Sequence, residues 1–203
     1  MNQEATFRVV LGAGFLAVLG VTLFHRLKSW ASKEVLDRRQ EGLFILATLR
    51  PVGLLLWLSV IAYLVNPAWM AWASVPLPAG LRWTGVAVFA AGLGLLTWTL
   101  RGLGTNLTDT VVTRRVHTLV TKGPYRWVRH PFYDAMALLI LAIALIAANW
   151  FVLVTGAAVF MLLAVRSRTE EAKLLAHFGE PYEAYRQRTG RFLPRWRPTN
   201  RDA

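Results

Sequence analysis

Residues 136–165 read MALLILAIALIAANWFVLVTGAAVFMLLAV, two apolar runs separated only by Asn149 and Trp150. Each run approaches the length that a helix rising 1.5 Å per residue needs to cross about 30 Å of hydrocarbon. A link this short allows only an antiparallel pair of helices, with Pro131 in the first turn of the leading helix. The stretch therefore predicts a transmembrane helical hairpin over 131–166.

The rest of the composition also indicates a membrane protein. Hydrophobic residues make up 55% of the 203 residues, and nine are tryptophan, which is more than a soluble core of this size needs. The chain contains no cysteine, which excludes disulfides, a thiolate nucleophile and cysteine metal ligands, and we expect no metal partner. The runs that we predict to span the bilayer are 9–24, 43–65, 81–100, 132–148 and 150–165.

These runs predict an all-α integral membrane protein with about five transmembrane helices. Residues 1–100 would form three N-terminal transmembrane helices. Residues 101–203 would form a second region that consists of a cytoplasmic loop, the hairpin at 131–166 and a C-terminal tail.

The positive charges predict the orientation in the membrane. The net charge is +12, and with five spans all of the 23 Lys and Arg residues except Arg8 and Arg82 fall on one face. The connections on the other face, 66–80 and 147–150, contain no charged residue. The positive-inside rule then places the N-terminus outside and the C-terminus in the cytoplasm. Basic residues beside membrane spans suit a lipid bilayer with anionic headgroups, and no nucleic-acid recognition module is present, so we expect no nucleic-acid partner.

The hairpin also brings two polar segments together at its open end. VRHPFY (128–133) precedes the first helix and RSRTEEAKLL (166–175) follows the second. Arg166 and Glu170 are four residues apart and face the same side of a helix. They would either contribute to a shared site at the membrane surface or form an ordinary surface ion pair, with the arginine reaching toward water.

The chemistry-bearing residues resemble those of a known family. The blocks HTLVTKGPYRWVRHPFY (117–133), RSRTEE (166–171) and FGEPYEAYRQRTGRFLP (178–194) are similar, in this order, to the C-terminal half of isoprenylcysteine carboxyl methyltransferases and their bacterial relatives. The wider group includes phospholipid N-methyltransferases. The first hundred residues match only in forming helical spans, so the resemblance says little about the acceptor.

The resemblance implies methyl transfer from S-adenosyl-L-methionine, giving S-adenosyl-L-homocysteine, to a lipophilic small-molecule or lipidated acceptor such as an isoprenylcysteine carboxylate. The cofactor needs N–H donors for its carboxylate, an anion for its ammonium and aromatic faces near its sulfonium. The helix start at Pro131 with His130 suits the first need, and Glu170 suits the second. Residues 101–203 would then be the catalytic region, with the active site on the cytoplasmic side. Arg166 and Glu170 would be catalytic, with Arg166 on the acceptor side. The implied cofactor-binding set is His117, Leu119, Val120, Tyr125, His130, Pro131, Phe132, Tyr133 and Glu170.

Three other functions fit parts of the sequence. They are a phospholipid N-methyltransferase, a sterol-reductase-like enzyme that uses a nicotinamide cofactor, and a non-catalytic membrane scaffold. Single residues also have alternatives: His117 could be a solvated loop histidine, and Tyr182 and Tyr185 either dock the tail or form a lid. We expect Trp127, Trp150 and Trp196 to lie at the membrane interface.

Overall fold

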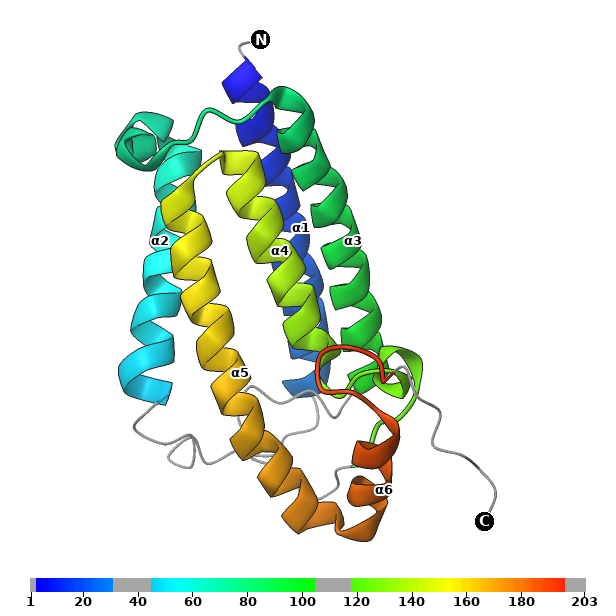
Figure 1. Cartoon of the computed structure of the whole chain (residues 1–203). Coiled ribbons are helices and arrows are strands. Elements are labelled where there is room, and N and C mark those ends of the chain that lie inside the picture. The colour runs from blue at the N-terminus through cyan, green and yellow to red at the C-terminus, as the bar shows by residue number, and fades with distance from the viewer. Residues whose placement is uncertain (1–2, 31–44, 105–117, 196–203) are drawn as a thin grey trace.

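A computed structural model describes residues 3–30, 45–104 and 118–195. Five long helices lie side by side along one axis, and a short sixth helix sits below one end of the bundle (Figure 1). The helices are α1 (Gln3–Trp30), α2 (Arg50–Val65), α3 (Ala79–Leu103), α4 (Pro131–Ala147), α5 (Trp150–Phe178) and α6 (Glu180–Arg188). Shorter helical turns are η2 (Ile45–Leu49), η3 (Pro67–Ala73) and η5 (Gly123–Arg126).

Each predicted apolar run lies largely within one of these helices, and no strand occurs in the described ranges. The all-α membrane fold is therefore confirmed. Four helical stretches are long and apolar enough to cross a membrane, namely Gln3–Lys28, Ala47–Val65, Ala79–Leu103 and Trp150–Phe178, whereas α4 is a shorter apolar helix of 17 residues. The count of five spans and the division at residue 100 remain predictions.

The last long helix extends well beyond its predicted apolar run. α5 has 29 residues, because the polar segment that follows Val165 continues the helix to Phe178. Gly179 ends it with a positive φ of 61°, a conformation that glycine adopts without steric cost. The polar residues of α5 are thereby carried on a rigid helix beyond the apolar part of the bundle.

The predicted hairpin between α4 and α5 is confirmed, and its turn has a specific anchor. Ala148 adopts the left-handed conformation, and the Asn149 side chain caps α5 by accepting a hydrogen bond of 3.1 Å from the Val152 amide. The same side chain donates a bond of 3.1 Å to the Met70 carbonyl in η3. The turn is thus fixed to the loop between α2 and α3.

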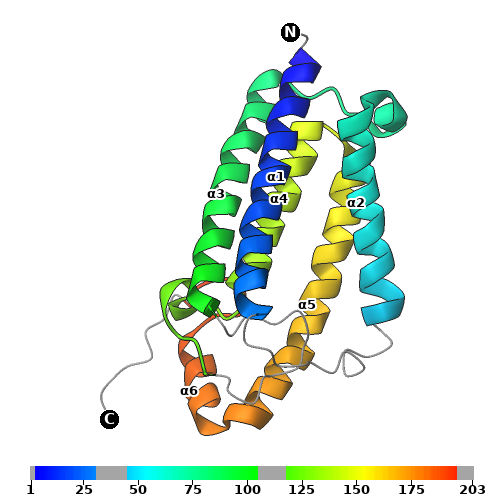
Figure 2. The ribbon, with the colours of Figure 1, turned by 180° about the vertical axis from the view of Figure 1, so that it is seen from behind.

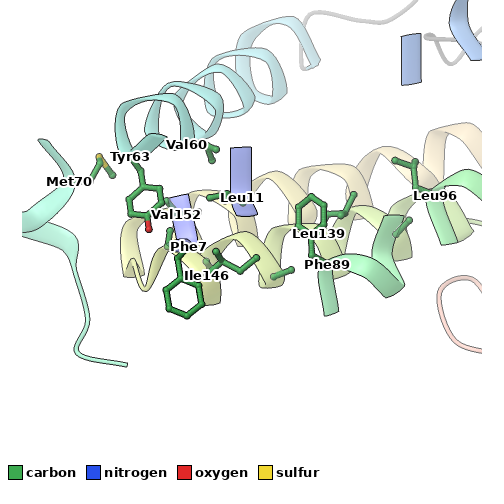
Figure 3. Packing of buried hydrophobic residues seen from close by; sticks show 14 of the residues in the cluster. Phe7, Leu11, Val60, Tyr63, Met70, Phe89, Leu96, Leu139, Ile146 and Val152 are labelled. Atoms are coloured by element: carbon green, nitrogen blue, oxygen red, sulfur yellow. The ribbon is translucent and has the colours of Figure 1, made fainter. Parts of the chain in front are cut away.

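The helices of the bundle pack closely through small residues, as is common in membrane proteins. A Cβ at Gly85 of α3 would come within 2.8 Å of Leu145 in α4, and one at Gly156 of α5 would overlap a methyl group of Ile140. Figure 3 shows the buried core residues that several helices contribute, and Figure 2 shows α1 packed beside α3 and α4. Outward-facing side chains such as Met161 are mostly exposed, as expected where lipid covers the surface.

A polar network joins four helices at the end of the bundle where α1 begins. Figure 1 shows this end at the top. Buried Arg82 of α3 donates to both carboxylate oxygens of Glu4 in α1, at 2.7 and 3.2 Å, and to the Tyr63 hydroxyl of α2 at 3.0 Å. Its Nε donates to the Ile146 carbonyl near the end of α4 at 2.9 Å. Arg8 donates to carbonyl groups at the end of α2. Both cations of this face are therefore bound by the protein itself.

Candidate active site

The polar segments that the hairpin was expected to bring together meet at the other end of the bundle, where α5, α6 and η5 converge (Figures 1 and 2). The chain that follows α6 returns to the start of α4. The Arg129 amide donates to the Gly190 carbonyl at 2.9 Å, and the His130 amide donates to the Arg191 carbonyl at 3.1 Å. The Gly190 amide donates to the Trp127 carbonyl at 3.2 Å. The C-terminal segment thus forms one side of the predicted site.

Glu170 is the centre of a first cluster. Its Oε1 accepts hydrogen bonds from the Tyr133 hydroxyl at 2.8 Å and from Arg166 Nε at 2.9 Å. Its Oε2 lies 3.8 Å from His130 Nδ1. A carboxylate offers about four acceptor positions. The two donors on Oε1 therefore leave capacity on Oε2 for a further cation.

Glu171 is the centre of a second cluster that our sequence prediction did not contain. Its carboxylate accepts from Arg129 Nε at 2.8 Å, from His130 Nε2 at 3.1 Å, and from Arg191 through Nε at 3.1 Å and Nη2 at 2.6 Å. Glu171 is only 5% exposed, so two guanidinium groups compensate a charge that is removed from water. Adjacent glutamates on α5 therefore serve two different clusters.

His130 lies between the two glutamates, and its ring is buried among aromatic side chains. Because ionised Glu171 can only accept, His130 carries a proton on Nε2. The His130 ring stacks on Tyr133 with centroids 5.3 Å apart and planes 10° apart, and Phe192 lies 5.8 Å from it. Phe192 also lies 5.8 Å from Phe160 of α5. The C-terminal segment thus supplies an aromatic wall that sequence reasoning missed.

Tyr125 and the two tyrosines of α6 form a buried group beside these clusters. The Tyr185 hydroxyl donates to the Tyr125 carbonyl at 2.7 Å, which docks α6 on η5. Burial raises the pKa of Tyr125 far above its usual range, and the nearby Tyr185 and Glu170 raise it further, so the phenol stays neutral. Tyr182 is 1% exposed, and its hydroxyl has no hydrogen-bond partner within the described residues. A docking contact is therefore present for Tyr185, and the lid alternative for the two tyrosines remains a prediction.

The start of α4 offers fewer unpaired amides than its sequence suggests. Pro131 has no N–H, and the amides of Tyr133 and Asp134 donate to the His130 carbonyl at 2.9 and 3.2 Å. His130 is the N-cap residue, but its side chain makes no capping bond. The positive end of the helix dipole still points toward the site.

The remaining predicted residues have varied surroundings. Pro131 is buried, Phe132 is half-buried with its ring 6.1 Å from that of Tyr133, and Leu119 and Val120 are half-buried. Their roles remain predictions. Trp127 and Trp150 are 42% and 45% exposed. His117 and Trp196 lie outside the described residues.

The fold and the clusters define an integral membrane protein with a polar, aromatic-lined site at one end of its helix bundle. The sequence model of the isoprenylcysteine carboxyl methyltransferase (ICMT) family matches residues 83–176. Over that region the chain is similar to this family, which is the family that its motifs resemble.

Two relatives extend this finding. The protein-S-isoprenylcysteine O-methyltransferase of Schizosaccharomyces pombe is 34% identical over 79 residues, which are 38% of this chain and 34% of that protein. The solved structure of the eukaryotic intramembrane Ras methyltransferase ICMT is 24% identical, with a TM-score of 0.57. The structural match covers 89% of this chain and 66% of the chain in that structure, and it shows a shared fold. The chain spans about a third of the length of the S. pombe relative that it matches.

Proposed function

We propose that the protein is an S-adenosyl-L-methionine-dependent methyltransferase that methylates the carboxylate of a lipophilic, isoprenylcysteine-like acceptor. The observation that carries this proposal is the position of Glu170 beside the stacked rings of His130 and Tyr133. A carboxylate with acceptor capacity suits the cofactor's ammonium, and aromatic faces attract its sulfonium. The S. pombe relative's name supports a carboxylate rather than an amine as the nucleophile.

The residues present fit this cofactor. Bound S-adenosyl-L-methionine supplies an electrophilic methyl group on a positively charged sulfur. Glu170 would bind the ammonium through Oε2, and the dipole at the start of α4 would favour the cofactor's carboxylate. Tyr133 and Phe192 would wall the site and exclude water.

The acceptor needs positioning more than it needs a base. An acceptor carboxylate is ionised at neutral pH, so its oxygen can attack directly while the methyl–sulfur bond breaks, leaving an ester and a neutral thioether. In-line displacement of this kind depends on orientation. Arg166 Nε donates to Glu170, and we assign its terminal nitrogens to the acceptor carboxylate. Arg166 would thereby align acceptor and donor across one helical turn.

For the orientation, we propose five spans with the N-terminus outside and the C-terminus and site in the cytoplasm. The exposed cations at the site end include Arg101, Arg126 and Arg168, whereas Arg8 and Arg82 at the other end bond to protein groups. This asymmetry supports the positive-inside assignment. Reporter fusions after residue 74 and after residue 203 should report opposite sides. Reporters on the same side would refute the topology.

The cofactor class is tested by calorimetric titration of the purified protein with S-adenosyl-L-homocysteine and, separately, with a reduced nicotinamide dinucleotide. We expect binding of the first and none of the second. Binding of the nicotinamide alone would favour a sterol-reductase-like enzyme. Binding of neither would favour a scaffold.

A further inference from the structure

The segment after α6 is held in place by a cluster that lies outside the proposed cofactor and acceptor contacts. We call it the tail clasp and define it as Arg129, Glu171 and Arg191. Glu171 on α5 receives four N–H···O contacts from three residues, two of which are the other clasp members. Arg129 also donates through Nη1 to the Arg186 carbonyl at 3.1 Å and to the Thr189 carbonyl. The clasp thus joins three parts of the chain: the segment before α4, helix α5 and the C-terminal segment.

The burial of the clasp means that its members depend on one another. The side chains of Arg129 and Glu171 are 8% and 6% exposed, and that of Arg191 is 34% exposed. A carboxylate buried to this degree is costly unless its partners remain in place. The binding of Glu171 raises the pKa of Arg191, which keeps this partner charged. Loss of the Glu171 charge should therefore release the C-terminal segment.

The backbone turns tightly beyond the clasp. A Cβ on Gly190 would collide with the carbonyl oxygen of Leu193, so the turn admits only glycine at this position. The turn brings Phe192 to 5.8 Å from the His130 ring and 6.5 Å from the Tyr133 ring. The position of Phe192 therefore follows from the position of the clasped segment.

We propose that Glu171 is a positioning residue for the site. Through Arg129 and Arg191 it holds the C-terminal segment so that Phe192 closes the aromatic wall, and through His130 Nε2 it fixes the histidine tautomer. The effect on the cofactor site rests on the proposed function, whereas the existence of the clasp does not. Glu170 and Glu171 are adjacent but would thus have separate roles. Glu170 would bind the ligand, and Glu171 would position the C-terminal segment that carries Phe192.

The test compares Glu171→Gln with Glu183→Gln in the whole 203-residue chain. Glu183 is a matched control, because it pairs with Arg186 in a partly exposed ion pair of 2.8 Å, and neither residue is a member of the clasp. Two quantities are measured: the rate of trypsin cleavage after Arg191, and the affinity for S-adenosyl-L-homocysteine by calorimetry. For Glu171→Gln we expect cleavage about tenfold faster and affinity about tenfold weaker, with unchanged helix content by circular dichroism. The control should behave like the wild type in both.

Each other outcome overturns a defined part of the inference. Unchanged cleavage in Glu171→Gln would show that the clasp does not hold the segment. Faster cleavage with unchanged affinity would make Glu171 purely structural. If the wild type binds no S-adenosyl-L-homocysteine, the proposed function and the positioning role both fail, while the cleavage rate still decides whether the clasp exists.

A second pair of variants covers the case in which Glu171→Gln does not fold. Arg191→Met removes two of the contacts to Glu171 but leaves Arg129 to neutralise it. Both readouts should move in the same direction as for Glu171→Gln, with cleavage followed after Arg188 in this variant and in the wild type, because trypsin does not cleave after methionine. Phe192→Ala should weaken the affinity without a comparable increase in cleavage. Normal affinity in both folded variants would remove the segment from the site.

Discussion

Replacing Glu170 by glutamine should weaken S-adenosyl-L-homocysteine binding by about tenfold to a hundredfold. Glutamine keeps the shape of the side chain and one acceptor oxygen for Tyr133 and Arg166, which bond to Oε1 at 2.8 and 2.9 Å. The variant loses the negative charge that Oε2 would offer to the ligand's ammonium. One charge-assisted hydrogen bond contributes about 1.5–3 kcal/mol, which gives this range of affinity.

Arg166→Ala is the companion variant, one helical turn away. If Arg166 orients the acceptor, the cofactor affinity should stay within about threefold of the wild type, while turnover falls by a factor on the order of a hundred. Arg166→Lys restores the charge without the planar fork. Partial rescue would indicate simple anion attraction, and no rescue would indicate bidentate carboxylate recognition.

The assays are calorimetry for affinity, single-turnover methyl transfer for rate, and thermal unfolding in the same detergent for stability. A double-mutant cycle over Glu170 and Arg166 separates ligand binding from a structural role. The reasoning is refuted if both folded variants bind S-adenosyl-L-homocysteine normally and their stability losses are strongly coupled. The two residues would then form only the surface ion pair that their spacing permits.

Other predictions concern the stability of the bundle. Arg82→Met removes the cation that pairs with the Glu4 carboxylate, which is partly open to water. We expect the free energy of unfolding to fall by about 2 kcal/mol, between the values for exposed and buried ion pairs. An unchanged melting temperature would refute this prediction. Gly156→Ala should lower the free energy of unfolding by about 1–3 kcal/mol, because the added methyl group overpacks the α4–α5 contact. Gly94→Ala adds a methyl group that meets nothing within 4 Å, so it should be neutral or stabilising. Equal effects of the two variants would contradict the packing. Tyr185→Phe should lower the free energy of unfolding by about 1 kcal/mol, because it leaves the buried Tyr125 carbonyl without its hydrogen bond. Tyr182→Phe removes a hydroxyl that has no partner among the described residues, so it should change stability very little. Thermal unfolding distinguishes the two variants.

The sequence could predict the helices and one of the two clusters because both depend on local regularities. Run lengths identified the helical segments, and the two-residue link required an antiparallel hairpin. The spacing of Arg166 and Glu170 is one helical turn, and the hairpin brings Tyr133 to the same end. These contacts follow from helix geometry and from one turn.

The clasp could not be derived in this way, because its contacts join residues that lie far apart in the chain. Glu171 meets Arg129 across 42 positions and Arg191 across 20, through a tail whose path no periodicity specifies. The second glutamate of RSRTEE was visible, but only the fold shows which cations it meets. The Arg82 network could not be predicted for the same reason, because Arg82 and Glu4 are 78 positions apart in the sequence.

The most direct test of the central claim is methyl transfer to a defined acceptor. The purified protein in lipid bilayers would be given S-adenosyl-L-methionine with a labelled methyl group and an S-prenylated cysteine with a free carboxylate. Its methyl ester would serve as the blocked control. We predict label on the free acid in a form that base releases as methanol, and none on the ester. Label found instead on amine headgroups of the lipids, or no transfer to either acceptor, would contradict the assignment.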